Sequence, residues 1–270
     1  MTAFSQLVII STIKKNIFLI LKFLNKIIFN MKKIIITGGD GRFAKTLKKK
    51  FYGRNIKYFS KKEFNITKIK LIERKIKKLK PDLILHLAAL SRPVIVHEKN
   101  LSKSIDINII GTCNLVKLCE KYKIKIVYMS THYVYPCKKG NYKETDGLLP
   151  ANNYSWSKLG GEAAVQMYHK NSLIIRVAMY ETPFIHKYAY TNIKSNFLTH
   201  EEVAKILPKL LRKKGIINLG GKKISIYNFA LKTNKNIKPI KYVHKKKSAV
   251  MMPDSSMNIS KLKSLLNKNK

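Results

Sequence analysis

Tyr154 and Lys158 are the two side chains of this sequence whose spacing most clearly suggests chemistry. Residues four apart lie on one face of a helix, one turn from each other. A lysine beside a tyrosine favours the phenolate and lowers the pKa of the phenol, so the tyrosine becomes a usable proton donor or acceptor near neutral pH. The chain has 14 tyrosines and many lysines, so this spacing also arises by chance. The pair gains weight only from the motifs that precede it.

A glycine-rich turn follows an apolar run upstream of this pair. Residues 33–37 read Lys-Ile-Ile-Ile-Thr, which is typical of a buried parallel strand. The next segment has the spacing Gly-x-x-Gly-x-x-Ala. Here Gly38 allows a tight turn, Gly41 lets the backbone approach a pyrophosphate, and Ala44 lets a helix pack closely on the strand. Because the spacing differs from G-x-G-x-x-G, the motif alone fits an ordinary strand-to-helix turn equally well.

Strands and helices alternate through the first two-thirds of the chain. This order predicts an α/β fold with a Rossmann-type doubly wound parallel sheet, which binds ligands at the carboxyl ends of its strands. Gly38, Ala88, Ser130 and Thr131 all follow predicted strands at such ends. The expected strands are residues 33–37, 55–59, 81–89, 124–129 and 172–177, and the expected helices are residues 47–51, 66–79, 101–122 and 153–169.

Seven segments, in order along residues 31–270, carry a resemblance to a known family. They include the turn Thr-Gly-Gly-Asp-Gly-Arg-Phe-Ala and the run Tyr-Ser-Trp-Ser-Lys. The chain resembles the extended short-chain dehydrogenase/reductase superfamily, and within it the dTDP-4-dehydrorhamnose reductase-like sugar-nucleotide reductases. The segments are residues 37–44, 86–89, 108–112, 130–135, 154–162, 215–221 and 252–262.

The resemblance implies the NAD(P)H-dependent reduction of a nucleotide-linked 4-keto sugar, in the synthesis of polysaccharide precursors. The implied catalytic residues are Tyr154, which gives a proton to the developing alkoxide, Lys158, which holds the nicotinamide ribose, and Thr131, which hydrogen-bonds the same oxygen. Ser130 is the reserve for Thr131, and Asn108 is expected to fix the lysine and an ordered water. Read without the family, Ser130 and Thr131 fit a strand-end turn, and Asn108 fits a satisfied polar residue between helices.

The end of the second strand bears on the choice of cofactor. NAD-binding folds commonly have an acidic residue there, whereas this chain has Ser60 and Lys61 and no carboxylate until Glu63. A hydroxyl and ammonium groups favour the 2′-phosphate of NADP(H), with NAD(H) as the alternative, although the abundance of lysine weakens the argument. The residues assigned to the cofactor are Gly38, Gly41, Arg42, Phe43, Ser60, Lys61, Asn65, Ile66, Ala88, Ala89, Asn108, Ser130, Tyr154 and Lys158, with Asn65 and Ile66 at the adenine.

Two departures from the family's pattern affect the substrate. His132 stands where relatives of the rhamnose type usually carry Asp, and a histidine there is expected to pack or hydrogen-bond. The related dehydratases carry an Asp-Glu pair at the positions of Thr131 and His132, so dehydration is not expected. Only residues 177–200 stand where the family has a longer substrate-binding region. The pocket is therefore expected to be reduced, open or completed by another chain.

Two other functions remain compatible with the same residues. One is a nucleotide-sugar epimerase that keeps NAD bound and recycles it. The other is a non-catalytic cofactor-binding protein, such as the regulatory subunit of methionine adenosyltransferase, which resembles this family. The short substrate region favours the binding protein, whereas the intact Thr131, Tyr154 and Lys158 argue against it.

The formal net charge of +41 first suggests a nucleic-acid partner. However, only six of the 55 basic residues are Arg, the residue that phosphate and base recognition prefers. Lysine is spread through nearly all segments together with much Ile and Asn, which fits a composition bias. No nucleic-acid module is recognisable, so no specific nucleic-acid partner is expected, while the positive charge favours an anionic nucleotide sugar.

The expected organisation has three parts. Residues 1–30 carry four lysines and no uncharged run of the roughly 18 residues that a membrane span needs. They are expected to be an extension outside the native fold, with Met31 as the true start. Residues 31–175 are expected to form the NAD(P)-binding Rossmann domain, and residues 176–270 a shortened substrate-binding lobe, although segments of this superfamily can return to the first lobe. A lysine-rich loop is expected over residues 235–247.

The cysteines add little. Cys113, Cys119 and Cys137 lack metal-ligand spacing and are odd in number, so neither a metal site nor a disulfide framework is expected. A reduced, cytoplasmic setting follows as the default. The resemblance also leaves room for a homodimer.

Overall fold

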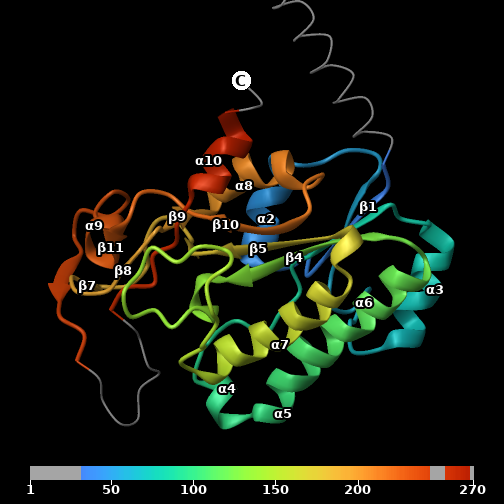
Figure 1. The fold of residues 1–270 in the computed structure, drawn as a ribbon, viewed down its shortest axis with the longest axis horizontal. Coiled ribbons are helices and arrows are strands. Elements are labelled where there is room, and N and C mark those ends of the chain that lie inside the picture. Colours follow the sequence, from blue (N-terminus) through green and yellow to red (C-terminus); the bar gives the residue numbers. More distant parts are fainter. Residues whose placement is uncertain (1–31, 244–252, 268–270) are drawn as a thin grey trace, which may run out of the picture.

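The computed structural model describes residues 32–243 and 253–267 (Figure 1). A six-stranded parallel sheet runs through it in the order β10-β5-β4-β3-β1-β2. This arrangement confirms the predicted Rossmann-type doubly wound fold. The strands of the sheet are β1 (Ile34–Thr37), β2 (Ile56–Phe59), β3 (Leu83–His86), β4 (Lys125–Thr131), β5 (Ser172–Val177) and β10 (Gly215–Leu219).

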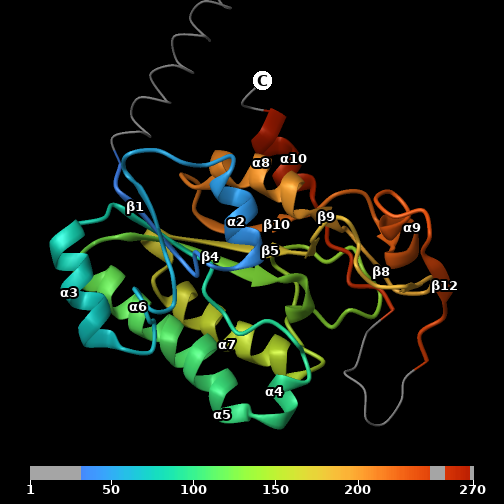
Figure 2. The ribbon, with the colours of Figure 1, turned by 180° about the vertical axis from the view of Figure 1, so that it is seen from behind.

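Helices cover both faces of the sheet, as Figures 1 and 2 show from opposite sides. Alternate residues of β1 supply the two resulting cores: Ile34 and Ile36 face one, and Ile35 faces the other. Burial on both faces explains why the strands read as continuous apolar runs rather than as alternating patterns. One face carries α2 (Arg42–Lys48), α8 (His200–Leu210) and α10 (Ser260–Asn267), and the other carries α3 (Ile69–Leu79), α6 (Gly111–Lys121) and α7 (Asn153–Met167).

The expected helix over residues 101–122 is interrupted. It consists of α5 (Leu101–Ser104), a π-helical segment η1 (Ile105–Ile110) and α6. Hydrophobic periodicity alone cannot distinguish these turns, because the apolar side chains still recur on one side. Such π-segments often occur at functional sites. The short α4 (Val96–Lys99) precedes α5 and was not predicted.

The chain after β5 forms a small lobe with its own core, which includes Phe184, Phe197 and Phe229. Residues 177–200 contain no helix before α8, only short strands. The elements of the lobe are β6 (Met179–Tyr180), β7 (Tyr188–Tyr190), β8 (Lys194–Ser195), β9 (Leu198–Thr199), β11 (Ile224–Ser225), α9 (Ile226–Ala230) and β12 (Lys238–Ile240). Elsewhere in the described part of the chain, 3-10 turns occur at η2 (His132–Val134) and η3 (His169–Asn171).

The predicted boundary at residue 176 does not separate two parts of the chain in space. After the first strands of the lobe, α8 packs on α2, β10 pairs with β5, and α10 packs on β10. Residues 200–219 and 260–267 therefore belong to the layers of the first domain. The pairing with β10 also protects β5, which would otherwise be an exposed sheet edge.

Two expectations about terminal and loop segments meet different outcomes. The predicted loop over residues 235–247 is wrong in its first part, since Lys238–Ile240 forms β12 and pairs with β7. The expectations for residues 1–30, and for the end of that loop, fall outside the described residues. Within residues 32–243 and 253–267, no helix is long and apolar enough to cross a membrane.

Candidate active site

A cleft of about 910 Å³ opens at the carboxyl ends of β1, β3, β4 and β5. It brings together all three predicted catalytic residues, Thr131, Tyr154 and Lys158. Two predicted cofactor residues, Ser60 and Asn108, do not line it. The predicted cofactor residues that do line it are Gly38, Gly41, Arg42, Phe43, Lys61, Asn65, Ile66, Ala88, Ala89, Ser130, Tyr154 and Lys158.

The glycine-rich turn forms one wall of the cleft. Gly38 adopts a φ of +68°, and a Cβ built on it would lie 2.8 Å from the Cα and N atoms of Ala88. No residue with a side chain fits there, because the next loop approaches the bare backbone. The amide of Gly41 donates to the carbonyl of Gly38 at 2.9 Å, and Gly41 is the N-cap residue of α2. The turn is thus a backbone cradle at a helix start, which suits the pyrophosphate of a dinucleotide.

Tyr154 lies in the first turn of α7, which begins where Asn152 accepts a hydrogen bond from the amide of Ser155 at 2.9 Å. Its phenol interacts with the side chain of Thr131. Burial raises the pKa of Tyr154, while the interaction with Thr131 and the positive charge of Arg92 act in the opposite direction. The expectation that Lys158 lowers this pKa is wrong, because burial raises the pKa and the charge that opposes this shift is that of Arg92.

Lys158 is buried one turn further along α7, with 4% of its surface exposed. Its Nζ lies 4.1 Å from the ring centroid of Tyr128, whose π face attracts a cation. Burial lowers the pKa of Lys158 to about 7, and the carboxylate of Glu162 opposes this shift. The side chain is therefore balanced between its charged and neutral forms near neutral pH.

A buried chain of hydrogen bonds lies behind the cleft. His86 Nδ1 lies 2.9 Å from Thr37 Oγ1, and His86 Nε2 lies 3.1 Å from Thr112 Oγ1. Because Thr112 gives its own hydrogen to the carbonyl of Asn108 at 2.7 Å, Nε2 of His86 must be the donor and Nδ1 the acceptor. Burial lowers the pKa of His86 to about 3, so the ring stays neutral.

Asn108 supports the cleft without lining it. Its side chain accepts from the amide of Leu90 at 2.8 Å and donates to the carbonyl of Leu90 at 2.9 Å. The same amide donates to Ser157 Oγ at 2.8 Å. Asn108 therefore ties the loop after β3 to the neighbour of Lys158 on α7 and does not hold Lys158 itself.

The end of β2 differs from the expectation in one respect. Glu63 turns back, and its carboxylate accepts from both the amide and the hydroxyl of Ser60, at 2.9 and 2.7 Å. Those two bonds lower the pKa of Glu63 and occupy the Ser60 hydroxyl. Of the two residues proposed for a 2′-phosphate, only Lys61 lines the cleft. Asn65, at the adenine position, accepts from the amide of Thr67 at 3.1 Å.

Ser130 and His132 flank Thr131 and both point to structural partners. The hydroxyl of Ser130 donates to Oε2 of Glu162 at 2.6 Å, so the idea of Ser130 as a reserve donor needs correction. His132 Nδ1 lies 3.1 Å from the carbonyl of Val177, and its ring packs on Tyr133 with centroids 3.9 Å apart. This agrees with the expected packing and hydrogen-bonding role, and burial lowers the pKa of His132 to about 4.

Sequence reasoning missed a group of residues on the far wall of the cleft. Glu181 accepts from Arg42 at 2.6 Å and from Arg92 at 3.4 Å, so it joins the glycine-rich turn to the loop after β3. The guanidinium of Arg92 also lies 5.8 Å from the ring centroid of Tyr180. Arg42 was predicted from the glycine-rich turn, whereas the scarcity of arginine was the available signal for Arg92. Other aromatic residues that line the cleft and were not predicted include Tyr133, His186, Tyr190, His200 and Tyr242.

Comparison with known proteins gives a consistent family. The profile described as "RmlD substrate binding domain" matches residues 31–200. A dTDP-D-glucose 4,6-dehydratase of Dictyostelium discoideum is 29% identical over 253 residues, covering 79% of this chain and 53% of that protein. A dTDP-4-dehydrorhamnose reductase of Aggregatibacter actinomycetemcomitans is 30% identical over 152 residues, covering 55% of this chain and 51% of that protein.

A methionine adenosyltransferase 2 subunit beta of Danio rerio is 27% identical over 157 residues, covering 54% of this chain and 47% of that protein. The chain thus spans about half the length of the curated relatives it matches. Among solved structures, the dTDP-4-dehydrorhamnose reductase of Bacillus anthracis in complex with NADP has a TM-score of 0.77 at 23% identity, covering 87% of this chain and 91% of that one. This likeness supports the fold.

Proposed function

Because the chain belongs to the RmlD substrate binding domain family, we propose that it is an NADPH-dependent reductase of a nucleotide-linked 4-keto sugar. The observation that carries the proposal is the convergence of Thr131, Tyr154 and Lys158 with the glycine-rich turn in one cleft. A backbone cradle for a pyrophosphate and a phenol–lysine pair are the two parts that such a reaction needs. The product would serve the synthesis of polysaccharide precursors.

The residues present fit a dinucleotide. Gly38 and Gly41 leave the backbone bare where a pyrophosphate approaches, and Lys61 lines the cleft where the adenosine ribose would lie. A nicotinamide cofactor supplies the hydride when it is bound. The ammonium of Lys61 supports NADPH, because it could pair with a 2′-phosphate. NADH is the alternative, because the carboxylate of Glu63 follows β2 and such an acidic residue commonly binds the ribose of NAD.

Tyr154 is the proposed acid. Its phenol would give a proton to the oxygen of the sugar ketone as charge develops there, while Thr131, which interacts with the phenol, would stabilise the same oxygen. Lys158 would hold the nicotinamide ribose from the next turn of α7. Burial raises the pKa of Tyr154, and the positive charge of Arg92 opposes that shift, so it would favour the phenolate that remains after proton transfer.

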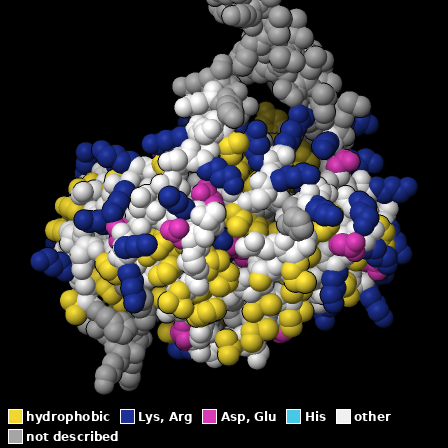
Figure 3. Space-filling view, in the orientation of Figure 1, with side chains coloured by type: hydrophobic (Ala, Val, Ile, Leu, Met, Phe, Trp, Pro, Cys, Tyr) yellow, Lys and Arg dark blue, Asp and Glu magenta, His cyan; other side chains and the backbone are white. Residues whose placement is uncertain are grey.

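The far wall of the cleft supports an anionic substrate. Arg42 and Arg92 line the cleft and share one carboxylate, Glu181, so these three side chains carry net positive charge. Lysine and arginine are also spread widely over the surface, as Figure 3 shows for one face. A nucleotide diphosphate group would be attracted to this wall. No specific nucleic-acid partner is proposed.

The reaction can be tested by adding a dTDP-4-keto sugar to the protein with NADPH and then with NADH. Loss of nicotinamide absorbance that depends on both sugar and protein is expected, faster with NADPH. Cofactor that stays bound through purification, without net oxidation, would instead indicate the epimerase. Cofactor binding without any sugar turnover would indicate the regulatory binding protein, the function that the match to methionine adenosyltransferase 2 subunit beta supports.

A homodimer is proposed as well. An apolar depression of about 350 Å³ lies between α5, η1 and α7, with Leu101, Ile105 and Trp156 among its lining residues. Leu101 and Trp156 are about half exposed, and hydrophobic side chains gather over this region in Figure 3. A second copy of the chain would cover them. Light scattering that reports a monomer at micromolar concentration would argue against the dimer.

The reaction is proposed to take place in the cytoplasm. Cys113, Cys119 and Cys137 are all free thiols, which fits a reducing compartment. The family match supports a protein that works on nucleotide sugars, and we propose that it meets them in the cytoplasm.

A further inference from the structure

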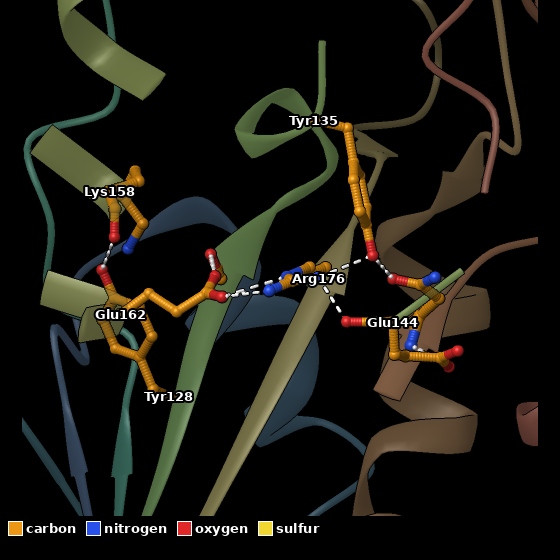
Figure 4. A network of polar contacts seen from close by, with 8 residues as sticks. Tyr128, Tyr135, Glu144, Lys158, Glu162 and Arg176 are labelled. Atoms are coloured by element: carbon orange, nitrogen blue, oxygen red, sulfur yellow. Dashed lines mark hydrogen bonds and ion pairs between the residues drawn. The ribbon is translucent and has the colours of Figure 1, made fainter. Parts of the chain in front are cut away.

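A buried ion pair lies directly behind the proposed catalytic residues. Tyr154, Lys158 and Glu162 follow one another at intervals of four residues on α7, so they share one face of the helix. Glu162 is fully buried and Arg176 is 1% exposed. The guanidinium of Arg176 donates twice to Oε1 of Glu162, from Nε at 3.0 Å and from Nη2 at 2.5 Å (Figure 4).

The other oxygen of the carboxylate reaches the active site. Oε2 of Glu162 accepts the hydrogen of Ser130 at 2.6 Å. Ser130 precedes Thr131 at the end of β4, so this bond fixes the strand end against α7. Each oxygen of Glu162 thus has its own partner, as a buried carboxylate requires.

Arg176 also connects this pair to the C-terminal part of the chain. Its Nη1 donates to the hydroxyl of Tyr135 at 2.7 Å and to the carbonyl of Glu144 at 3.2 Å. The hydroxyl of Tyr135 lies 2.9 Å from Oδ1 of Asn218 on β10, and the amide of Asn218 donates to the carbonyl of Asn258 at 3.3 Å. The network therefore runs from the catalytic helix across the sheet to the segment before α10.

The geometry points to Glu162 as a positioning residue for Lys158 and Thr131, with Arg176 and Ser130 holding its carboxylate in place for that role. This inference rests on the proposed function. A merely structural ion pair would be costly to bury and replaceable by apolar side chains. Glu162 differs, because it lies one turn from Lys158 and is bonded to the neighbour of Thr131.

Lys158 is where the role of Glu162 can be measured. The titratable groups facing Lys158 come from three elements: Tyr154 and Glu162 of α7, Tyr128 of β4 and His86 of β3. Of these, Glu162 supplies the negative charge and raises the pKa of Lys158 against the effect of burial. The guanidinium of Arg176 carries the opposite charge beside Glu162, so we expect the two members of the pair to act on Lys158 with opposite sign.

The test uses the full chain without cofactor or sugar, with lysine labelled at its ε carbon. Nuclear magnetic resonance would follow the titration of Lys158, identified by its absence in Lys158→Met. Glu162→Gln should move the midpoint down and Arg176→Met should move it up, each by about one pH unit, a tenfold change in the ratio of charged to neutral lysine. The double variant Glu162→Gln with Arg176→Met should return the midpoint towards that of the wild type.

Unchanged midpoints, or shifts of the same sign in both single variants, would overturn the inference. Glu162→Gln leaves a buried arginine without its counter-ion and is the variant at risk of not folding. Arg176→Met and the double variant then still decide the sign. Because the readout needs no turnover, it is independent of whether the protein reduces a sugar.

Turnover gives a second, separate readout. Ser130→Ala removes the bond to Glu162 and should lower kcat by about tenfold, the effect of some 1.4 kcal/mol on the barrier, while the Kd for NADPH changes by less. The matched control is Ser172→Ala, a buried serine at the opposite end of the sheet, which should leave both values unchanged. Equal effects of the two substitutions would contradict the positioning role.

Discussion

Tyr154 and Lys158 lie on the same face of α7 and both line the cleft, yet burial rather than the other member of the pair dominates the pKa of each. Burial raises the pKa of the phenol and lowers that of the ammonium to about 7. Both shifts favour the neutral form, as expected when the interior disfavours charge. The charges that oppose burial come from Arg92 for the tyrosine and from Glu162 for the lysine.

Tyr154→Phe should abolish sugar reduction and leave cofactor binding unchanged. The substitution removes the proton donor and keeps the ring, and general acid catalysis contributes about 10²–10⁴-fold to such steps. NADPH fluorescence measures binding and nicotinamide absorbance measures turnover. Tyr52→Phe, at an exposed tyrosine far from the cleft lining, is the control. Activity of Tyr154→Phe equal to that of wild type would refute the proposed acid.

Lys158→Ala should weaken both cofactor binding and turnover. In the wild type, the affinity for NADPH should fall as pH rises through about 7, because the ammonium of Lys158 then loses its proton. Calorimetric titration from pH 6 to 9 would measure this dependence. The variant should show weaker binding with a flatter pH dependence, and Lys205→Ala, at an exposed lysine of α8, should behave as wild type. A steep, unchanged pH dependence in Lys158→Ala would assign the titration to another group.

Gly161→Ala should destabilise the fold by about 1–3 kcal/mol, the usual cost of overpacking. A Cβ on Gly161 would lie 2.6 Å from the carbonyl oxygen of Asn108 and 2.7 Å from the hydroxyl of Tyr128. The helix α7 would have to move away from η1 and β4, which also displaces Lys158. Urea denaturation measures the free energy of unfolding. Gly147→Ala, where the new Cβ meets nothing within 4 Å, should stay close to wild type.

Stability should fall as pH decreases from about 6.5 towards 4. Burial lowers the pKa values of His86 and His132 to about 3 and about 4, whereas the unfolded chain takes up these protons near 6.5. The unfolded state therefore binds more protons in that window, and a histidine shifted this far contributes on the order of 3 kcal/mol to the loss.

Thermal unfolding at pH 7 and pH 4.5 would check this dependence. His132→Asn keeps a donor for the carbonyl of Val177 but cannot titrate, so its melting temperature should drop less between the two pH values. His186→Asn, at an exposed histidine, should show the full drop. Identical drops in the two variants would show that His132 does not contribute.

Much of the fold could be predicted because its strands are buried on both faces, which leaves continuous apolar runs in the sequence. Gly38 could be interpreted for a similar reason, since only a bare backbone tolerates its φ and the approach of Ala88. The family's order of motifs then located Thr131, Tyr154 and Lys158 at one edge of the sheet. The positions of these residues could be predicted because they follow from local sequence motifs and from where the strands end.

Features that depend on pairing across the chain were missed. Arg92 and Glu181 come from different loops and form an ion pair. Glu162 of α7 forms an ion pair with Arg176 of β5. The pKa of Tyr154 was misjudged for the same reason, because the depth of burial is a tertiary property that the spacing of Tyr154 and Lys158 does not contain. The return of β10 to the sheet was likewise invisible locally, since its five residues read like any short strand.

The central claim, reduction of a nucleotide-linked keto sugar, is tested most directly by titrating the protein with NADPH and NADH, then adding dTDP-4-keto sugar and following nicotinamide absorbance. The account predicts oxidation of the cofactor on adding the sugar, faster with NADPH, and none with Tyr154→Phe. Tight cofactor binding with no oxidation on adding the sugar, in the wild type as in Tyr154→Phe, would contradict it.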